Sequence, residues 1–296
     1  MQPTTTHRLL TATTSLLIAA SAFAQDPFAY EGFQYGSTPN MQFANGGVGW
    51  SSKWNKLSSI PTGVVGPGLT WPGLVTNGNC AITPGYPSAD FTLYTRALAP
   101  YAAMNDTIYV SFLMEPEAGF GQGGGLSFTA TPQIIVGASL GKSLYGLTIP
   151  FVSSNNSNVP VVQFETALLV TRIVANGDGT ATYSLFVNPT MGQPQPVTPS
   201  CEMTIAGGLP PIVTLVNDGG FATDEIRFGP TWSSVLPSTI PPSCPADLDG
   251  NGTVDGADLG MLLANWGAAA SAADLNGDGA VDGADLGVLL ASWGPC

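Results

Sequence analysis

The C-terminal part of this 296-residue chain contains a duplicated acidic sequence, and this repeat constrains the fold more than any other feature. Residues 246–260 align with residues 273–287, and the match continues downstream through a Leu-Leu pair and a Trp-Gly pair in each copy. Two copies in identical register predict a repeat module in which each copy folds into the same local structure.

Each copy places oxygen-bearing side chains at positions 1, 3, 5, 9 and 12 of a loop, with a glycine at position 6, where the loop turns sharply. Position 7 would supply a backbone carbonyl. Because a hard cation takes six to eight oxygens at about 2.3–2.6 Å, this donor set predicts two Ca²⁺ ions rather than a soft metal. The predicted ligands are Asp247, Asp249, Asn251, Thr253, Asp255 and Asp258 in the first copy and Asp274, Asn276, Asp278, Ala280, Asp282 and Asp285 in the second.

The end of each loop departs from an ordinary EF-hand, because position 12 holds Asp258 or Asp285 instead of Glu. Since Asp has a shorter reach than Glu, either the backbone approaches the ion more closely or the coordination is weaker. Val254 and Val281, at position 8, are expected to pair the two loops through a short β contact.

A helix is predicted from Asp258 onward, and again in the second copy, because Leu and Trp recur at i, i+3, i+4 and i+7. No comparable pattern precedes either loop, so each unit is expected to be a loop with one exit helix. The two helices are expected to pack face to face through these stripes, which are Leu259, Leu262, Leu263 and Trp266, and Leu286, Leu289, Leu290 and Trp293.

Metal binding is expected to be coupled to folding in this segment. Residues 244–296 carry eight Asp and no Lys, Arg or Glu, so the carboxylates would repel one another without a cation. We therefore expect an unfolded apo segment and a folded calcium-bound one. The alternative is an acidic disordered tail, the usual fate of a run of like charges.

This duplicated segment resembles a two-repeat dockerin, and its Trp-Gly-Pro-Cys ending is similar to variant dockerins at the C-termini of exported planctomycete proteins. The resemblance implies calcium binding by the matched residues. Cellulosomal dockerins bind a cohesin through Ser/Thr at loop positions 10 and 11 and basic residues on the exit helix. Here those positions hold Gly256-Ala257 and Gly283-Ala284, and the helices carry no Lys or Arg. The expected partner is therefore a cohesin-like or other surface receptor, bound in another way.

Residues 1–24 are predicted to be a secretory signal peptide, with a short membrane anchor as the alternative. Arg8 is the only charged residue before Asp26, and an apolar stretch ends in Ala22-Phe23-Ala24. Threonines interrupt that stretch, which is too short to span about 30 Å of hydrocarbon. The mature chain is thus expected to be secreted, at the cell surface or periplasmic, with no membrane span. Cleavage would also remove His7, the only histidine, which excludes Ser-His-Asp catalysis and histidine-ligated metals.

The charge balance excludes another class of partner. Seven Lys and Arg stand against 20 Asp and Glu, a formal net charge of −13. Sequence-independent binding to nucleic acid needs clustered basic residues, so no nucleic-acid partner is expected.

The region before the proline-rich linker 237–243 is predicted to be a β domain, residues 25–236. Runs rich in β-branched and aromatic residues alternate with Gly, Pro and Asn turns, and no long helical period stands out. This pattern favours an antiparallel β-sandwich, with a mixed α+β domain as the alternative. The predicted strands are 91–96, 107–114, 133–137, 161–175, 180–187, 212–216 and 225–228.

Several segments of this region are similar to concanavalin A-like (laminin G-like) jelly-roll domains of exported bacterial proteins. They are Asn45-Gly-Gly-Val-Gly-Trp50 with Trp54, and residues 109–113, 123–128, 187–190 and 224–229. The resemblance implies two facing antiparallel sheets, often with carbohydrate or protein recognition. The full fold expectation is a concanavalin A-like jelly roll joined to a small α-helical calcium domain at residues 244–296.

Four cysteines allow three pairings, and an exported protein permits disulfides. Their spacing suggests a Cys80–Cys201 bond within the β domain and a Cys244–Cys296 bond that joins the two ends of the C-terminal segment.

The favoured function is an exported, non-enzymatic carbohydrate- or protein-binding β-sandwich attached through the calcium module. Aromatic residues in Gly/Pro-rich loops are candidates for stacking on sugar rings, namely Trp50, Trp54, Trp71 and Tyr86. The alternative for each of them is a place in the core, since large aromatics are mostly buried.

Two other functions remain open. A polysaccharide-degrading hydrolase or lyase would need paired carboxyls, and Glu115 and Glu117 would share one face of a strand. Pro116 between them favours an edge or a loop, and the Glu-x-Asp-x-x-Glu motif of concanavalin-like glucanases is absent. In the last hypothesis, the chain is a structural component of an envelope or appendage.

Overall fold

The computed structural model describes residues 26–85, 91–101, 103, 105–128, 133–141, 143–238, 245–249, 251, 253–269 and 271–295. The expected signal peptide, Tyr86, Cys244, Cys296 and residues 239–243 of the expected linker lie outside these ranges. No helix among the described residues has the length and apolar character needed to cross a bilayer.

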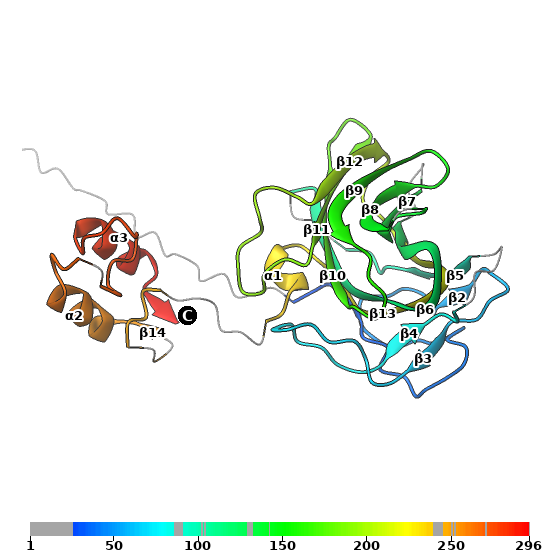
Figure 1. The fold of residues 1–296 in the computed structure, drawn as a ribbon, viewed down its shortest axis with the longest axis horizontal. Coiled ribbons are helices and arrows are strands. Elements are labelled where there is room, and N and C mark those ends of the chain that lie inside the picture. The colour runs from blue at the N-terminus through cyan, green and yellow to red at the C-terminus, as the bar shows by residue number, and fades with distance from the viewer. Residues whose placement is uncertain are drawn as a thin grey trace, which may run out of the picture.

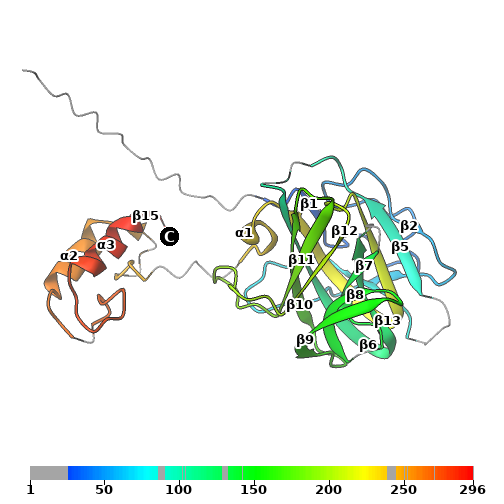
Figure 2. The same ribbon diagram turned by 90° about the horizontal axis from the view of Figure 1, so that it is seen from above.

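The front region is an antiparallel β-sandwich in which every described strand pairing is antiparallel (Figures 1 and 2). The first layer runs in the order β12 (Cys201–Ala206), β11 (Thr180–Val187), β10 (Ala167–Ala175), β6 (Thr107–Phe128), β13 (Ile212–Gly229), β4 (Cys80–Ile82) and β3 (Gly63–Val65), with β1 (Ala29–Glu31) also on β13. The second layer contains β9 (Ser153–Pro160), β8 (Leu144–Ile149), β7 (Ile134–Ala138), β5 (Thr92–Ala97) and β2 (Asn55–Lys56).

Two long strands, β6 and β13, belong to both layers. The first part of β6 pairs with β10, and its last residues pair with β7. The register between β6 and β13 shifts around Gly219, which has a φ of +82°. A Cβ at this position would lie 2.3 Å from the backbone oxygen of Gly119, so only glycine allows the strands to approach and bend here.

The main core lies between the layers and is built by period-2 alternation. On β5, Thr92, Tyr94 and Arg96 are buried while the residues between them are partly exposed. A second cluster covers the outer face of the first layer, where Leu113, Leu168 and Phe186 pack beneath the short helix α1 (Trp232–Val235) and nearby loops.

The prediction of a mainly β antiparallel sandwich is confirmed, and the only helix in the described part of residues 26–238 is α1, with four residues. Strand boundaries were predicted less well. The run 161–175 is strand only from Ala167, while 212–216 and 225–228 belong to the single strand β13. The prediction for 107–114 stopped too early, because β6 continues through a glycine-rich stretch to Phe128.

The predicted Cys80–Cys201 disulfide is wrong. Both thiols are free and buried, with Cys80 on β4 and Cys201 on β12. Strands β11, β10, β6 and β13 separate these two strands in the sheet order, so the sulfur atoms cannot meet.

The C-terminal unit contains β14 (Thr253–Val254), α2 (Gly256–Ala264), α3 (Gly283–Ala291) and β15 (Gly294–Pro295). Among the described residues, no helix leads directly into either loop, so each loop has an exit helix alone, as predicted. The expected pairing of Val254 with Val281 is wrong. Val254, in the first loop, instead pairs with Gly294, which follows α3. The carbonyl of Val281, in the second loop, accepts a 2.8 Å hydrogen bond from the amide of Gly267, which follows α2. Each loop thus contacts the segment that follows the helix of the other copy.

The expected packing through complete Leu/Trp stripes is only partly correct. Leu262 and Leu289 are fully buried in a small core with both valines. Leu259 and Leu286 are partly buried against this core, whereas the last two residues of each stripe turn outward, because the core is too small to cover four large side chains per helix. Those exposed to about half of their surface are Leu263, Trp266, Leu290 and Trp293.

Candidate functional site

The first acidic loop brings three carboxylates together. One oxygen each from Asp247, Asp249 and Asp258 lies within 4.8 Å of the other two. Two oxygens bound to one Ca²⁺ at about 2.3–2.6 Å are no more than about 5 Å apart, so this spacing fits a single ion. Like charges at such separations repel unless a cation lies between them.

Asp258 is the most constrained of these three residues. Its Oδ1 accepts hydrogen bonds from the backbone amides of Leu248 (2.7 Å) and Asp249 (3.2 Å), and its Oδ2 accepts one from Asp255 (2.8 Å). The hydrogen bond from the Asp255 amide is the main reason why the pKa of Asp258 is lowered. These amides favour the ionised form of the carboxylate, and Oδ2, which accepts a single hydrogen bond, keeps a lone pair for a cation.

The second loop repeats this frame. The carboxylate of Asp285 accepts hydrogen bonds from the backbone amides of Leu275 (2.7 Å), Asn276 (3.1 Å) and Asp282 (2.7 Å). The hydrogen bond from the Asp282 amide is the main reason why the pKa of Asp285 is lowered. The carboxylate of Asp274 accepts hydrogen bonds from three backbone amides in the turn of the loop, those of Gly277, Asp278 and Gly279. The inward-facing amides hold the carboxylates of the loop at its centre.

The remaining predicted ligands have a visible structural role in the loops. Asp255 and Asp282 cap α2 and α3, since each accepts a hydrogen bond from the amide two residues later. The amide oxygen of Asn251 accepts from Thr253, and that of Asn276 accepts from Asp278. Thr253 lies on β14 and Ala280 follows the turn, where only their backbone carbonyls would serve a metal.

The donor set fits Ca²⁺ on chemical grounds. It consists of carboxylate, amide and carbonyl oxygens, and residues 244–296 contain no Lys, Arg or His that would neutralise the eight Asp. A buried carboxylate such as that of Asp258 or Asp285 is costly without a counter-charge. A divalent cation in each loop would supply that charge.

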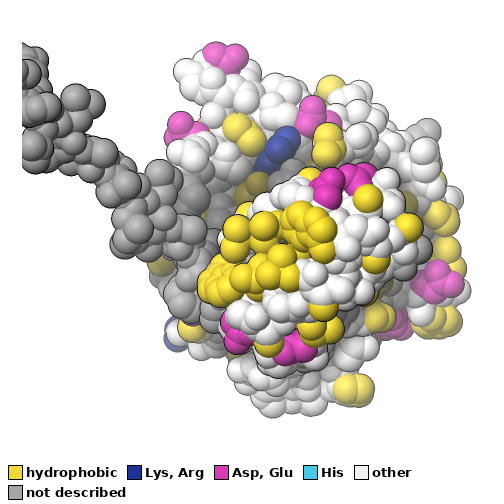
Figure 3. Space-filling model, turned by 90° about the vertical axis from the view of Figure 1, so that its left-hand side faces the viewer, with side chains coloured by type: hydrophobic (Ala, Val, Ile, Leu, Met, Phe, Trp, Pro, Cys, Tyr) yellow, Lys and Arg dark blue, Asp and Glu magenta, His cyan; other side chains and the backbone are white. Residues whose placement is uncertain are grey.

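An apolar face accompanies the acidic loops on the C-terminal unit. Figure 3 shows hydrophobic side chains gathered in an elongated patch, with acidic side chains at its edges. The exposed apolar residues of α2, α3 and the turns that follow them occur in matching pairs at the same positions of the two copies. They are Met261, Leu263, Trp266, Val288, Leu290 and Trp293.

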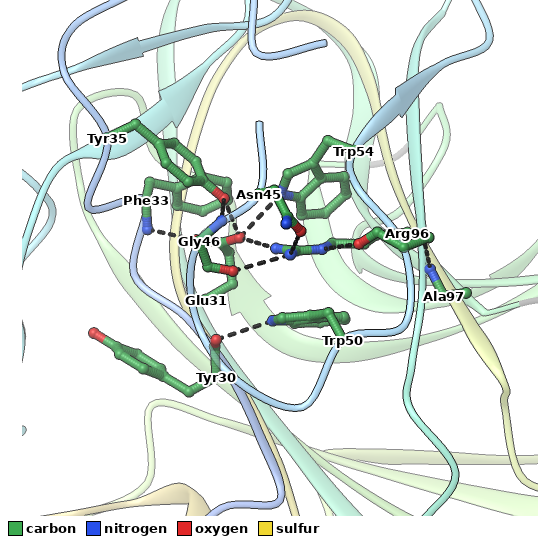
Figure 4. Close-up of polar contacts among 11 residues, drawn as sticks. Tyr30, Glu31, Phe33, Tyr35, Asn45, Gly46, Trp50, Trp54, Arg96 and Ala97 are labelled. Carbon is green, nitrogen blue, oxygen red and sulfur yellow. Dashed lines mark hydrogen bonds and ion pairs between the residues drawn. The ribbon is translucent and has the colours of Figure 1, made fainter. Parts of the chain in front are cut away.

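The predicted sugar-stacking aromatics do not form one exposed platform. Trp54 is fully buried and its Nε1 donates to Glu31, so it cannot stack on a ligand, which corrects the prediction for this residue (Figure 4). Trp50 is half-buried beneath the Arg96 guanidinium and donates to the Tyr30 carbonyl. Trp71 packs on the outer cluster of the first layer, and Tyr86 lies outside the described residues.

Glu31 and Arg96 form the centre of the cluster drawn in Figure 4. Both are almost fully buried, and the Arg96 guanidinium also donates to Asn45 (3.1 Å) and to the Gly46 carbonyl (2.9 Å). Every charged group here has several protein partners, so the cluster holds the N-terminal segment on β5 and has no free functional group.

Glu115 and Glu117 share a face of β6, as their spacing predicts, with the buried Pro116 between them. Pro116 pairs with Phe221 on β13, and its carbonyl accepts a 2.7 Å hydrogen bond from the Phe164 amide, which belongs to no strand. Strand β10 pairs with β6 only up to Met114 and β7 only from Gly124, so Pro116 has a strand on one side, which agrees with the expected edge position. Glu115 accepts a 2.5 Å hydrogen bond from Thr166. Burial, and then the charge of Glu115, raises the pKa of Glu117.

The sequence did not indicate a groove on the outer face of the second layer. Its volume is about 630 Å³, and its floor includes Leu93, Ile135 and Val216. None of its lining residues is ionisable. Neither the predicted aromatics nor the Glu115–Glu117 pair lines this groove.

No family model matches the chain, and no curated protein matches it. Among solved structures, an endo-β-1,4-glucuronan lyase from the fungus Trichoderma reesei is similar, with 12% identity, a TM-score of 0.42, and coverage of 67% of this chain and 97% of that one. A carbohydrate esterase from Shiga toxin-encoding bacteriophage phi24B has 10% identity and a TM-score of 0.39, with 65% of this chain and 98% of that one covered.

An endo-1,3-β-glucanase from Streptomyces sioyaensis has 6% identity and a TM-score of 0.36, with 70% of this chain and 92% of that one covered.

Proposed function

We propose that this chain is an exported calcium-binding protein that attaches to a surface partner through residues 244–296. The observation that carries this proposal is the convergence of the Asp247, Asp249 and Asp258 oxygens within 4.8 Å of one another. The second loop supports two ions per chain, because it repeats the same ligand positions and the same amide frame around Asp285.

The calcium ions would hold in place the two helices that carry the exposed apolar residues of the C-terminal unit. Asp258 and Asp285 each lie in the first turn of a helix whose outer side carries exposed leucine or valine. An ion held by each loop would therefore set the position of α2 and α3. Calcium would act on partner binding by folding this surface rather than by touching the partner.

The chemistry of the face defines the partner. The two helices carry no Lys or Arg, and loop positions 10 and 11 are Gly-Ala in both copies, so polar recognition of the cellulosomal kind has no side chains to use. Exposed Leu263, Trp266, Leu290 and Trp293 instead favour a receptor with an apolar surface. Basic residues at the rim of that receptor would complement the surrounding Asp.

Retention of the purified full chain on the native cell envelope, with Ca²⁺ or with EDTA, tests this function. We expect retention in Ca²⁺ that EDTA abolishes and that Leu263→Asp with Leu290→Asp also abolishes. Both side chains are about half exposed, so these changes should leave the fold intact. Val197→Asp, a fully exposed position in the β-sandwich, is the control and should bind normally. Equal retention with and without Ca²⁺ would contradict the proposal.

A polysaccharide-degrading activity is the second candidate, and the Glu115–Glu117 pair favours it. The two carboxyls share a face, and the raised pKa of Glu117 suits a general acid. A reducing-end assay on neutral and uronic-acid polysaccharides tests this activity. The activity should be lost in Glu115→Gln and Glu117→Gln but retained in the exposed neighbour Glu165→Gln. Absence of activity in the wild type would exclude it for those substrates.

A further inference from the structure

The groove on the second layer lies on a sheet face that alternation would normally leave polar. Residues of β5, β13 and β7 that point away from the main core form its floor. They include Leu93, Ile135, Ile212 and Val216. An antiparallel sheet usually presents polar side chains on the face opposite its core, so this apolar floor needs a separate explanation.

The register of the strands explains why the face is hollow. Val216 pairs with Gly125, Gly125 with Gly137, and Gly137 with Gly146, so a row of glycines runs across β6, β7 and β8 beside the floor. Gly125 and Gly137 have φ values of +148° and +153°, and a Cβ on either would lie about 2 Å from a carbonyl oxygen of the neighbouring strand. Gly125 and Gly137 therefore require glycine, and the row leaves the sheet beside Val216 without side chains.

The polar atoms of the floor are already engaged by protein. Thr214 Oγ1 donates to Thr95 Oγ1 at 3.1 Å, and Thr95 Oγ1 donates to the Val213 carbonyl at 3.3 Å. Gln133 donates its amide to Ser127 Oγ at 2.5 Å. These hydrogen bonds use the donors of both threonines and one of the two Gln133 donors, so the floor offers few groups to the many hydroxyls of a sugar.

The mouth of the groove carries an aromatic side chain in an unfavourable setting. Phe151 is 100% exposed and has a φ of +62°, a conformation that costs free energy for a bulky residue. Nothing in the described fold compensates for the exposure of this ring. A ligand in the groove would cover it, together with the exposed Leu57 on the opposite strand pair.

We propose that this groove binds an uncharged apolar small molecule, such as a hydrocarbon chain or an aromatic ring system. Its volume of about 630 Å³ falls in the range of ligand sites, about 300–1,000 Å³. Charge decides the class of ligand. The described residues that line the groove include no ionisable side chain, so they offer no partner to an anion or a cation, whereas a neutral apolar molecule can be covered without burying an unpaired charge. This site is independent of the calcium module and of the Glu115–Glu117 pair.

Titration of the full calcium-loaded chain with the neutral dye Nile red tests the proposal, with 1-decanol and laminarihexaose as competitors. We expect saturable binding that decanol displaces and the sugar does not. Phe151→Asp and Leu57→Asp put a charge at the mouth on exposed positions, and each should weaken binding at least about tenfold. Phe164→Asp is the matched control, because Phe164 is also an exposed Phe with a φ of +62° but does not line the groove.

Three outcomes would overturn the proposal. Displacement by laminarihexaose would make the groove a glycan site. Loss of dye binding in Leu263→Asp with Leu290→Asp, and not in Phe151→Asp, would place the dye on the C-terminal face. A dimer in sedimentation that Phe151→Asp dissociates would identify a second copy of the chain as the occupant.

Discussion

The buried carboxylate of Asp258 accepts a 2.7 Å hydrogen bond from the backbone amide of Leu248, ten residues earlier in the chain. Asp285 and Leu275 repeat this contact at the same distance. The contact closes each acidic loop by joining its last position to its second. The backbone of each loop thus closes around an Asp side chain, which is shorter than the Glu at this position of an EF-hand.

Replacement of either closing residue should remove one calcium site and leave the other. Asp258→Ala and Asp285→Ala each remove a predicted calcium ligand that also accepts hydrogen bonds from three backbone amides of its loop. We therefore expect each single variant to bind one Ca²⁺ per chain instead of two. The affinity of the altered loop should fall by more than the 10–100-fold typical of a lost supporting contact. Calcium titration by calorimetry measures this effect, with the exposed Asp26→Ala as control. An unchanged stoichiometry in both variants would contradict the ligand assignment.

The Glu31–Arg96 ion pair should matter to stability through the charge that a single substitution leaves unpaired. Arg96→Met leaves the carboxylate of Glu31 buried without its partner and should lower the free energy of unfolding by about 3–5 kcal/mol. Adding Glu31→Gln should recover part of that loss. Urea unfolding of the β-sandwich measures both values. Arg172→Met, which removes one 3.3 Å hydrogen bond to Ser184, is the control and should cost about 1 kcal/mol. Equal losses at both arginines would refute the argument.

Asp224 should make the β-sandwich less stable as pH rises. This carboxyl is buried and accepts the amides of Leu69 (2.9 Å) and Glu225 (2.7 Å), and burial, then the charge of Glu225, raises its pKa to about 8. In the unfolded chain the group ionises near its ordinary value of 3.8. The folded state therefore holds the proton more tightly, and its contribution is complete below about pH 4 and is lost as the pH rises to about 8.

Comparison with Asp224→Asn isolates this effect, since the other titrating groups are common to both proteins. Between pH 4 and 8 the wild type should lose stability relative to the variant, by at most about 1.4 kcal/mol per pH unit. Urea unfolding at saturating Ca²⁺ measures the difference. Parallel stability profiles for the two proteins would show that Asp224 does not titrate in this range.

The free thiols give a direct check on the corrected disulfide. Burial raises the pKa of Cys80 to about 12 and that of Cys201 to about 11, so neither forms a reactive thiolate at neutral pH. We expect both residues to resist alkylation in the native protein and to react at once in urea without reductant. Peptide mass spectrometry locates the label. A Cys80–Cys201 peptide linked by a disulfide would contradict the observed strand order.

The local pattern of the sequence predicted the parts of the molecule that depend on short-range spacing. The convergence of Asp247, Asp249 and Asp258 follows from the spacing of the acidic loop, and strand 180–187 follows from its β-branched and aromatic residues. The packing of the helices was predicted less well. A period of 3.6 indicates which residues share a face but does not show that the small core has room for only Leu262 and Leu289.

Features that depend on contacts between distant strands were not predictable from one sequence. The glycines near Gly219 look like a loop in the sequence, yet they bend β6 and β13 without ending either strand. The polar strand β9 has no apolar alternation to indicate it. The groove depends on the alignment of Gly125 with Gly137 across two strands, which no local pattern contains. For the same reason, nothing in the spacing of Trp54 indicated that Glu31 holds it in the core.

Calcium titration of the full chain, after treatment with a chelator, tests the central claim most directly. Calorimetry should give two Ca²⁺ ions per chain, and the ellipticity at 222 nm should become more negative as α2 and α3 form. EDTA should reverse that change and leave the β-sandwich folded. No binding of Ca²⁺, or an unchanged helical signal in EDTA, would contradict the account of the acidic loops.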